Sequence, residues 1–158
     1  MILYHGSNQV IDKVNLQKSR PNKDFGKAFY LSDTLQQAEE MALFKAEVEG
    51  GTPVVNKFEF DESLMVSPSL NVLTFEGYSA EWAHFVFANR DAANGDAQHG
   101  YDIVFGPIAN DRVGRQIANL KDGYIDFETF IARVNFMKGI TFQFAFCSEK
   151  AVSQLVKI

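Results

Sequence analysis

The chain has 158 residues, enough for one core, and we expect a single domain over 1–158. Its net charge of -5 argues against a general nucleic-acid or membrane-surface binder, because both need a basic face. A single cysteine, Cys147, allows no internal disulfide. With no signal-peptide pattern and no apolar run of about 20 residues, we expect a cytoplasmic protein.

Strands and helices are predicted in mixed order along the chain. Apolar alternation and bounding turn residues predict strands over 2–7, 27–32, 54–60, 64–67, 71–75, 101–105 and 141–147. Helical spacing predicts helices over about 34–49, 80–92, 111–120 and 126–137, and a last helix after Ser148. Asp33, Ser79 and Ser148 are expected to cap helices, and the polar segment 8–23 is expected to be a loop.

This order lacks the regular strand–helix alternation of a doubly wound sheet. Neither the GxGxxG pattern of a dinucleotide-binding fold nor the GxxxxGK[ST] pattern of a P-loop is present. The sequence therefore predicts an α+β domain with a mostly antiparallel sheet.

Two segments could carry chemistry. His5 ends a strand beside Gly6 and Ser7, so its ring could hold a hydroxyl while the glycine backbone admits a ligand. Tyr30 lies in a strand whose alternation puts Phe29 and Tyr30 on opposite faces. One of the two could then stack on a cationic aromatic ring. A hydrogen-bonded histidine at a strand end and two core aromatics are the alternatives.

The combination of the two segments resembles the ADP-ribosyltransferase superfamily, in the His–Tyr–Glu branch of diphtheria toxin and the poly(ADP-ribose) polymerases. That resemblance implies a small, mostly antiparallel split β-sheet flanked by helices, with NAD as the substrate. It implies that His5 holds the ribose, with Ser7 beside it, and that Tyr30 stacks on the nicotinamide. We therefore expect His5 and Tyr30 to line one cleft and His5 to add little to the core.

A closer resemblance is to the bacterial family called domain of unknown function 3990. It is carried by a YHGS start, a DFG-K-x-FY-L-S block, and later WxxFxxxxNR, YDxVxGPxAxDR and QxxFxSEKA-like blocks. These blocks lie at 4–7, 24–32, 82–90, 101–112 and 143–151, so they span nearly the whole chain.

The third position of the His–Tyr–Glu pattern is occupied by Gln143. Phe142, Phe144 and Phe146 alternate, so Gln143 is expected on the opposite face of its strand. An amide can accept a ribose hydroxyl but gives a cationic transition state less stabilisation than a carboxylate. Glu149 is the nearby carboxylate, although an acid in the first turn of a helix is common.

Asp111 and Arg112 follow a Gly-Pro turn and could bind a phosphate, or could brace the helix that they open. Arg90 is expected to be structural, pairing near Asp91. His84 and His99 lack a second ligand at metal spacing, so no metal site is predicted.

The resemblance implies an NAD-dependent ADP-ribosyltransferase, a glycosyltransferase that modifies a macromolecule. A cytoplasmic protein of this kind fits a bacterial toxin of a toxin–antitoxin system, with an antitoxin protein as a partner. The alternative is a catalytically weak or inactive module of the same fold that binds NAD, ADP-ribose or a protein. A phosphotransferase acting on RNA is disfavoured by the acidic charge.

Overall fold

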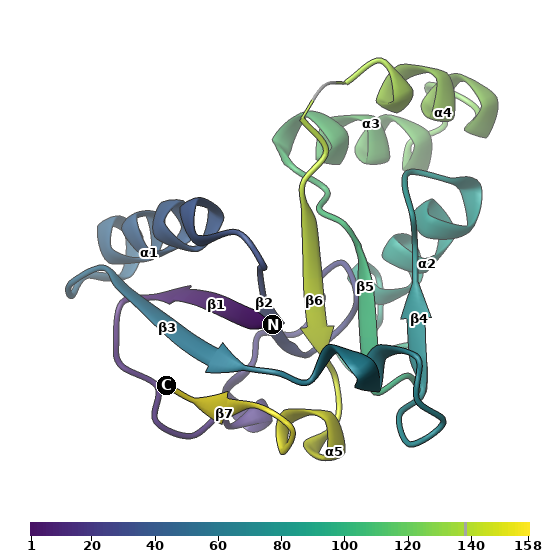
Figure 1. Ribbon diagram of the computed structural model, residues 1–158. Coiled ribbons are helices and arrows are strands. Elements are labelled where there is room, and N and C mark those ends of the chain that lie inside the picture. The colour runs from purple at the N-terminus through teal and green to yellow at the C-terminus, as the bar shows by residue number, and fades with distance from the viewer. Residues whose placement is uncertain (138) are drawn as a thin grey trace.

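The computed structural model describes residues 1–137 and 139–158 and shows an α+β protein with two sheets and five α-helices in that part (Figure 1). The strands are β1 Ile2–Ser7, β2 Phe29–Leu31, β3 Val54–Glu59, β4 Val72–Thr74, β5 Ile103–Pro107, β6 Phe142–Phe146 and β7 Val156–Lys157. The helices are α1 Leu35–Glu49, α2 Ala80–Arg90, α3 Asp111–Lys121, α4 Phe127–Asn135 and α5 Glu149–Val152. Two short 3-10 turns lie at Leu16–Lys18 and Glu62–Met65.

The strands form two mostly antiparallel sheets. The first has the order β1-β3-β7, and the second has the order β2-β6-β5-β4, in which only β4 and β5 run parallel. A single bridge between Tyr4 and Ser32 joins β1 to β2. The expected mostly antiparallel α+β arrangement is therefore confirmed.

Helix α1 covers part of the first sheet because small residues meet at the contact. Its buried side chains are Ala38 and Ala42, and a Cβ atom added to Gly6 in β1 would lie 2.1 Å from the Ala38 carbonyl oxygen. Only glycine lets the helix backbone approach this closely.

Strand β6 separates two hydrophobic clusters. Phe144 and Phe146 belong to one cluster with Leu3, whereas Ala145 belongs to the other with Trp82. The predicted alternation of β6 is confirmed, and it places Gln143 on the Ala145 face.

Several local predictions change. Helix α1 begins one residue later than expected, with Thr34 in place of Asp33 as N-cap, because the Ser32 hydroxyl already accepts a hydrogen bond from the Thr34 amide. The expected strand over 64–67 is wrong, because the Asp61 carboxylate accepts from the Ser63 amide and starts a 3-10 turn. Strand β7 was not predicted. The Ser79 and Ser148 caps are confirmed.

Across the described residues, no helix combines the length and the apolar character needed to cross a bilayer.

Candidate functional site

The His5 side chain is half-buried, and one side of its ring packs against the protein. Its ring stacks on Phe29 with 4.3 Å between ring centroids, and its Nδ1 atom lies 2.6 Å from the Tyr30 carbonyl oxygen, to which it donates. Burial lowers the pKa of His5 from 6.5 to about 4, so the ring is neutral near pH 7. His5 belongs to neither hydrophobic cluster, but its ring packs on Phe29, which is part of the core.

Gly6 and Ser7 are also covered. The space beside the Gly6 backbone, expected to admit a ligand, is filled by Ala38 and Ala42 of α1. Ser7 retains only 3% of its exposure. The glycine therefore serves helix packing in this structure.

Tyr30 is held by its own loop. Its hydroxyl donates to the Gly26 carbonyl oxygen at 2.7 Å and accepts from the Phe25 amide at 3.0 Å. Burial raises the pKa of this hydroxyl far above its usual value. The side chain packs against the cluster that contains Phe25, whereas Phe29, on which His5 stacks, belongs to the other cluster.

His5 and Tyr30 are thus neighbours through a backbone atom, but their side chains lie on opposite sides of β2. The expectation that both side chains line one cleft is wrong. A strand alternates its side chains, and here Phe29, not Tyr30, faces the histidine.

Gln143 lies in a polar cluster around Asp24. The Asp24 carboxylate accepts from Arg90 Nε at 2.8 Å, from the Ala109 amide at 3.1 Å and from Gln143 Nε2 at 3.4 Å. Tyr30 pairs with Ala145 in the sheet, so Tyr30 and Gln143 share one face of it. Two of the three expected residues therefore lie near each other, beside a carboxylate–guanidinium pair.

Arg90 has the expected structural role, but its partner is Asp24 and not a group near Asp91. Arg90 reaches across to Asp24, with 2.6 Å between its terminal nitrogen and a carboxylate oxygen, while Asp91 pairs with Lys121. This ion pair ties α2 to the loop before β2.

The remaining charged candidates lie at helix starts. Glu149 is exposed in the first turn of α5, where Ser148 is the cap. Asp111 and Arg112 are exposed in the first turn of α3, and the Asn110 side chain makes the capping bond there. These positions fit helix-start charges.

The structure shows a groove between α1 and the start of β6. Its volume is about 300 Å³, and its lining residues are Asp33, Thr34, Gln36, Gln37, Glu40, Phe105, Ile140, Thr141 and Phe142. In Figure 1 the amino-terminal part of α1 lies beside the first residues of β6. We call this hollow the α1–β6 groove.

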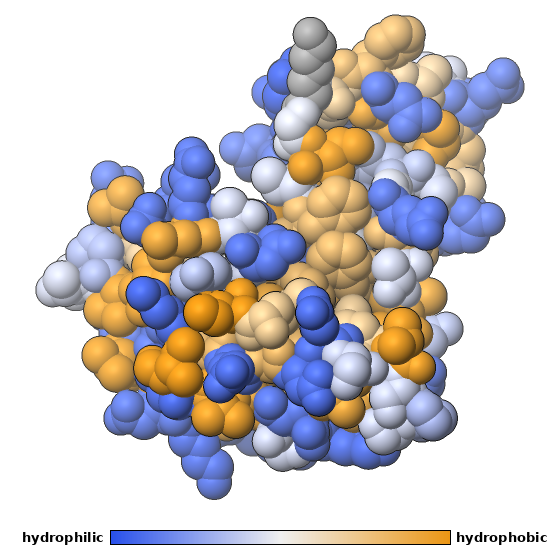
Figure 2. Space-filling view, in the orientation of Figure 1, coloured by the Kyte–Doolittle hydropathy of each residue, from blue (hydrophilic) through white to orange (hydrophobic). Residues whose placement is uncertain are grey.

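The floor of the α1–β6 groove is aromatic and its wall is polar. The Phe105 and Phe142 rings are stacked, with centroids 5.3 Å apart and planes 16° apart. Figure 2 shows hydrophobic side chains at the surface over β5 and β6. On the wall, Gln36 Nε2 donates to Glu40 at 3.0 Å, which fixes the carboxylate near the groove.

Gln37 holds the two sides of the groove together. Its Oε1 atom accepts from the Ser32 hydroxyl at 2.9 Å, and its Nε2 atom donates to the Phe142 carbonyl oxygen at 3.3 Å. The sequence analysis did not identify Glu40, Gln37 or Phe105. One sequence feature could have indicated these groove residues. The first turns of the helix after the Phe-Tyr strand hold two glutamines and two glutamates, at 36, 37, 39 and 40.

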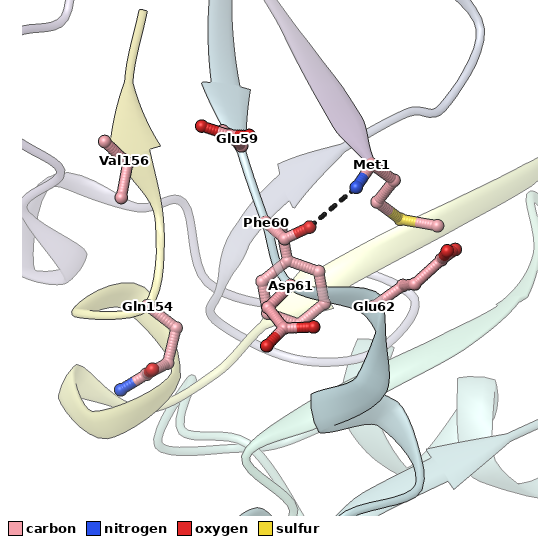
Figure 3. Close-up of a pocket in the computed structure, with 7 residues that line it drawn as sticks. All are labelled: Met1, Glu59, Phe60, Asp61, Glu62, Gln154 and Val156. Carbon is pink, nitrogen blue, oxygen red and sulfur yellow. Dashed lines mark hydrogen bonds between the residues drawn. The ribbon is translucent and has the colours of Figure 1, made fainter.

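A second hollow of about 420 Å³ lies at the edge of the first sheet, lined by Met1, Glu59, Phe60, Asp61, Glu62, Gln154 and Val156 (Figure 3). The Met1 amine donates to the Phe60 carbonyl oxygen at 2.8 Å. None of the residues identified from the sequence lines this hollow.

The His99 ring is held by backbone atoms, and the Cys147 thiol beside it is half-buried. His99 contacts the Phe25 carbonyl oxygen at 2.7 Å and accepts from the Tyr101 amide at 3.1 Å. Burial raises the pKa of the Cys147 thiol to about 12, so it stays protonated near neutral pH. Over residues 1–137 and 139–158, no group of three or more potential ligands gathers.

Fold and site together define a split-sheet α+β protein with an aromatic, acidic-rimmed groove. The family profile described as "Protein of unknown function (DUF3990)" matches residues 1–156, and the chain belongs to this family. No curated protein matches the chain.

Proposed function

We propose that the protein is an NAD-dependent ADP-ribosyltransferase that binds the nicotinamide and its ribose in the α1–β6 groove. The resemblance of the sequence to that superfamily motivates the reaction. The groove supplies a place for it, because it adjoins segments 24–32, 101–112 and 143–151, which carry the resemblance.

The stacked Phe105 and Phe142 rings and two carboxylates, which line the same groove, carry this proposal. Nicotinamide in NAD is a flat ring with a positive charge, and such rings are attracted both to aromatic faces and to acids. Asp33 and Glu40 supply the acids on the wall of the groove. A neutral ligand of the same shape would gain only the stacking.

The groove also offers a carboxylate for the chemical step. When the bond from ribose C1′ to the ring nitrogen breaks, its electron pair leaves with neutral nicotinamide and positive charge develops on the ribose. A carboxylate such as Glu40 stabilises that charge. A nucleophile on the acceptor then bonds to C1′ and gives up its proton to the carboxylate or to solvent.

In this proposal Tyr30 and His5 support the groove through their strands instead of touching NAD. Gln143 and Glu149 are less suited to the third role. Gln143 already donates to Asp24 on the opposite face of β6, and Glu149 follows the carboxyl end of that strand.

A second candidate is a module that binds NAD, ADP-ribose or a protein without catalysis. The observation that favours it is the Gln143–Asp24 contact, because an amide in a structural role takes the place of the expected glutamate. A module that binds NAD or ADP-ribose would use the same groove as the first candidate, but only the first candidate predicts turnover.

The test is nicotinamide release from NAD by the purified protein and by two matched variants. Glu40→Gln removes a groove carboxylate, whereas Glu39→Gln removes its exposed neighbour outside the groove. We expect Glu40→Gln to lower the release rate about tenfold or more, and Glu39→Gln to leave it unchanged. Binding of NAD without release would favour the non-catalytic module, and equal effects of the two variants would remove the groove from the mechanism.

A further inference from the structure

Helix α1 places small side chains against the sheet and leaves five large apolar side chains exposed, three of which, Met41, Phe44 and Val48, form one row. Ala38 and Ala42 contact the sheet, while Met41, Phe44 and Val48 keep 49%, 58% and 65% of their exposure. A surface helix of a globular protein normally shows the reverse arrangement. Leu35 and Leu43 are exposed on other sides of α1. A row of exposed large apolar side chains on a helix can form a contact surface.

The spacing of these residues is that of a helix–helix seam. Met41, Phe44 and Val48 are separated by three and four positions, and Gln37 extends the row toward the amino end. Side chains with alternating three- and four-residue spacing line one stripe of a helix, into which a second helix packs its own row. We call the row of Met41, Phe44 and Val48 the α1 seam.

The exposed flank of the α1 seam is acidic. Glu40 and Glu47 occupy the positions just before Met41 and Val48, and both are exposed. On the other flank Ala38 is buried and Lys45 is partly buried against the protein. A partner helix would therefore meet glutamates along the exposed flank of the α1 seam.

We propose that the α1 seam binds an amphipathic helix of another protein, with apolar residues along its seam and lysine or arginine beside them. A second copy of this chain is disfavoured, because two α1 seams would bring glutamates together and each chain carries a net charge of -5. Gln37 and Glu40 also line the α1–β6 groove, so the bound helix would lie along its edge. The docking itself does not depend on the reaction proposed for the groove.

The test uses a stapled, monomeric helical peptide with leucines at the three-four spacing and lysines on the flank that would face Glu40 and Glu47. Fluorescence anisotropy measures its binding to the full chain. We expect Phe44→Ser to weaken binding at least tenfold, and Leu43→Ser, an exposed change on another side of α1, to leave it unchanged. Melting temperatures confirm that both exposed substitutions leave the fold intact.

A second peptide with glutamates in place of the lysines tests the charge. We expect it not to bind the natural sequence, and we expect Glu47→Lys to weaken the lysine peptide and to strengthen the glutamate peptide. Equal binding of the lysine peptide to Phe44→Ser, or equal binding of the two peptides to the natural sequence, would overturn the proposal. Light scattering measures whether the natural chain forms a dimer. A dimer that is lost in Phe44→Ser would show that a second copy of the chain, and not a helix of another protein, occupies the α1 seam.

Discussion

His5 lies where its protonation must oppose folding. Its neutral ring stacks on Phe29 and donates to the Tyr30 carbonyl oxygen, and its pKa falls to about 4 from an ordinary 6.5. Above pH 6.5 neither the folded nor the unfolded chain protonates this group. Below pH 6.5 the unfolded chain takes up a proton that the folded chain excludes, so stability falls as the pH falls toward 4.

We predict that His5→Asn removes this pH dependence. Asparagine keeps a donor near Nδ1 without titrating, so the variant is less stable at pH 7 but loses less on acidification. The difference in unfolding free energy between the two proteins should narrow by about 2 kcal/mol from pH 7 to pH 5. Denaturant unfolding at both values measures it, and parallel pH profiles would contradict a buried neutral histidine.

A second prediction concerns the stability of a Gln143 variant. Its amide donates to the Asp24 carboxylate, and a glutamate there would place one carboxylate against another. Gln143→Glu should therefore lower stability at pH 7 by about 1–2 kcal/mol. The loss should shrink at acidic pH, because a protonated glutamate can donate to Asp24 again. A raised rate of nicotinamide release in a stable Gln143→Glu protein would instead return Gln143 to the catalytic position.

At this scale the sequence identified unusual residues but not their surroundings. The alternation of β6 correctly places Gln143 away from the phenylalanines. Which face of β2 meets His5 depends on the bridge between Tyr4 and Ser32, a contact between distant segments that no local pattern encodes. For this reason the expectation that the His5 and Tyr30 side chains line one cleft failed.

At the scale of elements, α1 depends on one glycine. A Cβ atom at Gly6 would lie 2.1 Å from the Ala38 oxygen and 2.7 Å from the Ala42 nitrogen, both backbone atoms that cannot rotate away. We predict that Gly6→Ala costs about 3 kcal/mol or displaces α1. Gly100→Ala is the matched control, because nothing lies within 4 Å of its added Cβ atom. Similar melting temperatures for the two variants would refute this packing.

The Asp24–Arg90 pair fixes α2 to the loop before β2 and to the segment after β5. Its side chains keep 12% and 31% of their exposure, and Asp24 also accepts from the Ala109 amide. Arg90→Ala should lower stability by about 2–3 kcal/mol, because it leaves a largely buried carboxylate without its partner. Lys121→Ala, which breaks the exposed pair with Asp91, should cost less than about 0.5 kcal/mol. Chemical denaturation compares the two, and equal losses would contradict this role of Asp24.

Element prediction succeeded where the signals were local. The Ser79 and Ser148 caps follow from the side chains at the starts of their own helices, and helices α3 and α4 follow from local apolar spacing. The strand expected over 64–67 failed because the Asp61 side chain closes a tight turn. Strand β7 escaped prediction because its two residues pair with β3 about one hundred positions away.

At the scale of the whole molecule, the α1–β6 groove exists because two sheets meet at one bridge. Helix α1 packs on the first sheet, while Phe105 and Phe142 lie in strands of the second sheet. The Gln37 side chain links the two sides, because it accepts a hydrogen bond from the Ser32 hydroxyl and donates one to the Phe142 carbonyl oxygen. The composition of the chain predicts a folded acidic protein. Only the three-dimensional arrangement brings aromatic rings from β5 and β6 into one groove with Asp33, just before α1, and Glu40, within α1.

The central claim is that NAD binds with its nicotinamide ring on the floor of the α1–β6 groove. A crystal structure of the protein soaked with NAD tests this directly. We expect the ring to stack on Phe105 or Phe142, with the adjoining ribose within hydrogen-bonding reach of Glu40 or Asp33. A nicotinamide ring stacked on Tyr30, or an empty groove at NAD concentrations that support nicotinamide release, would contradict the account.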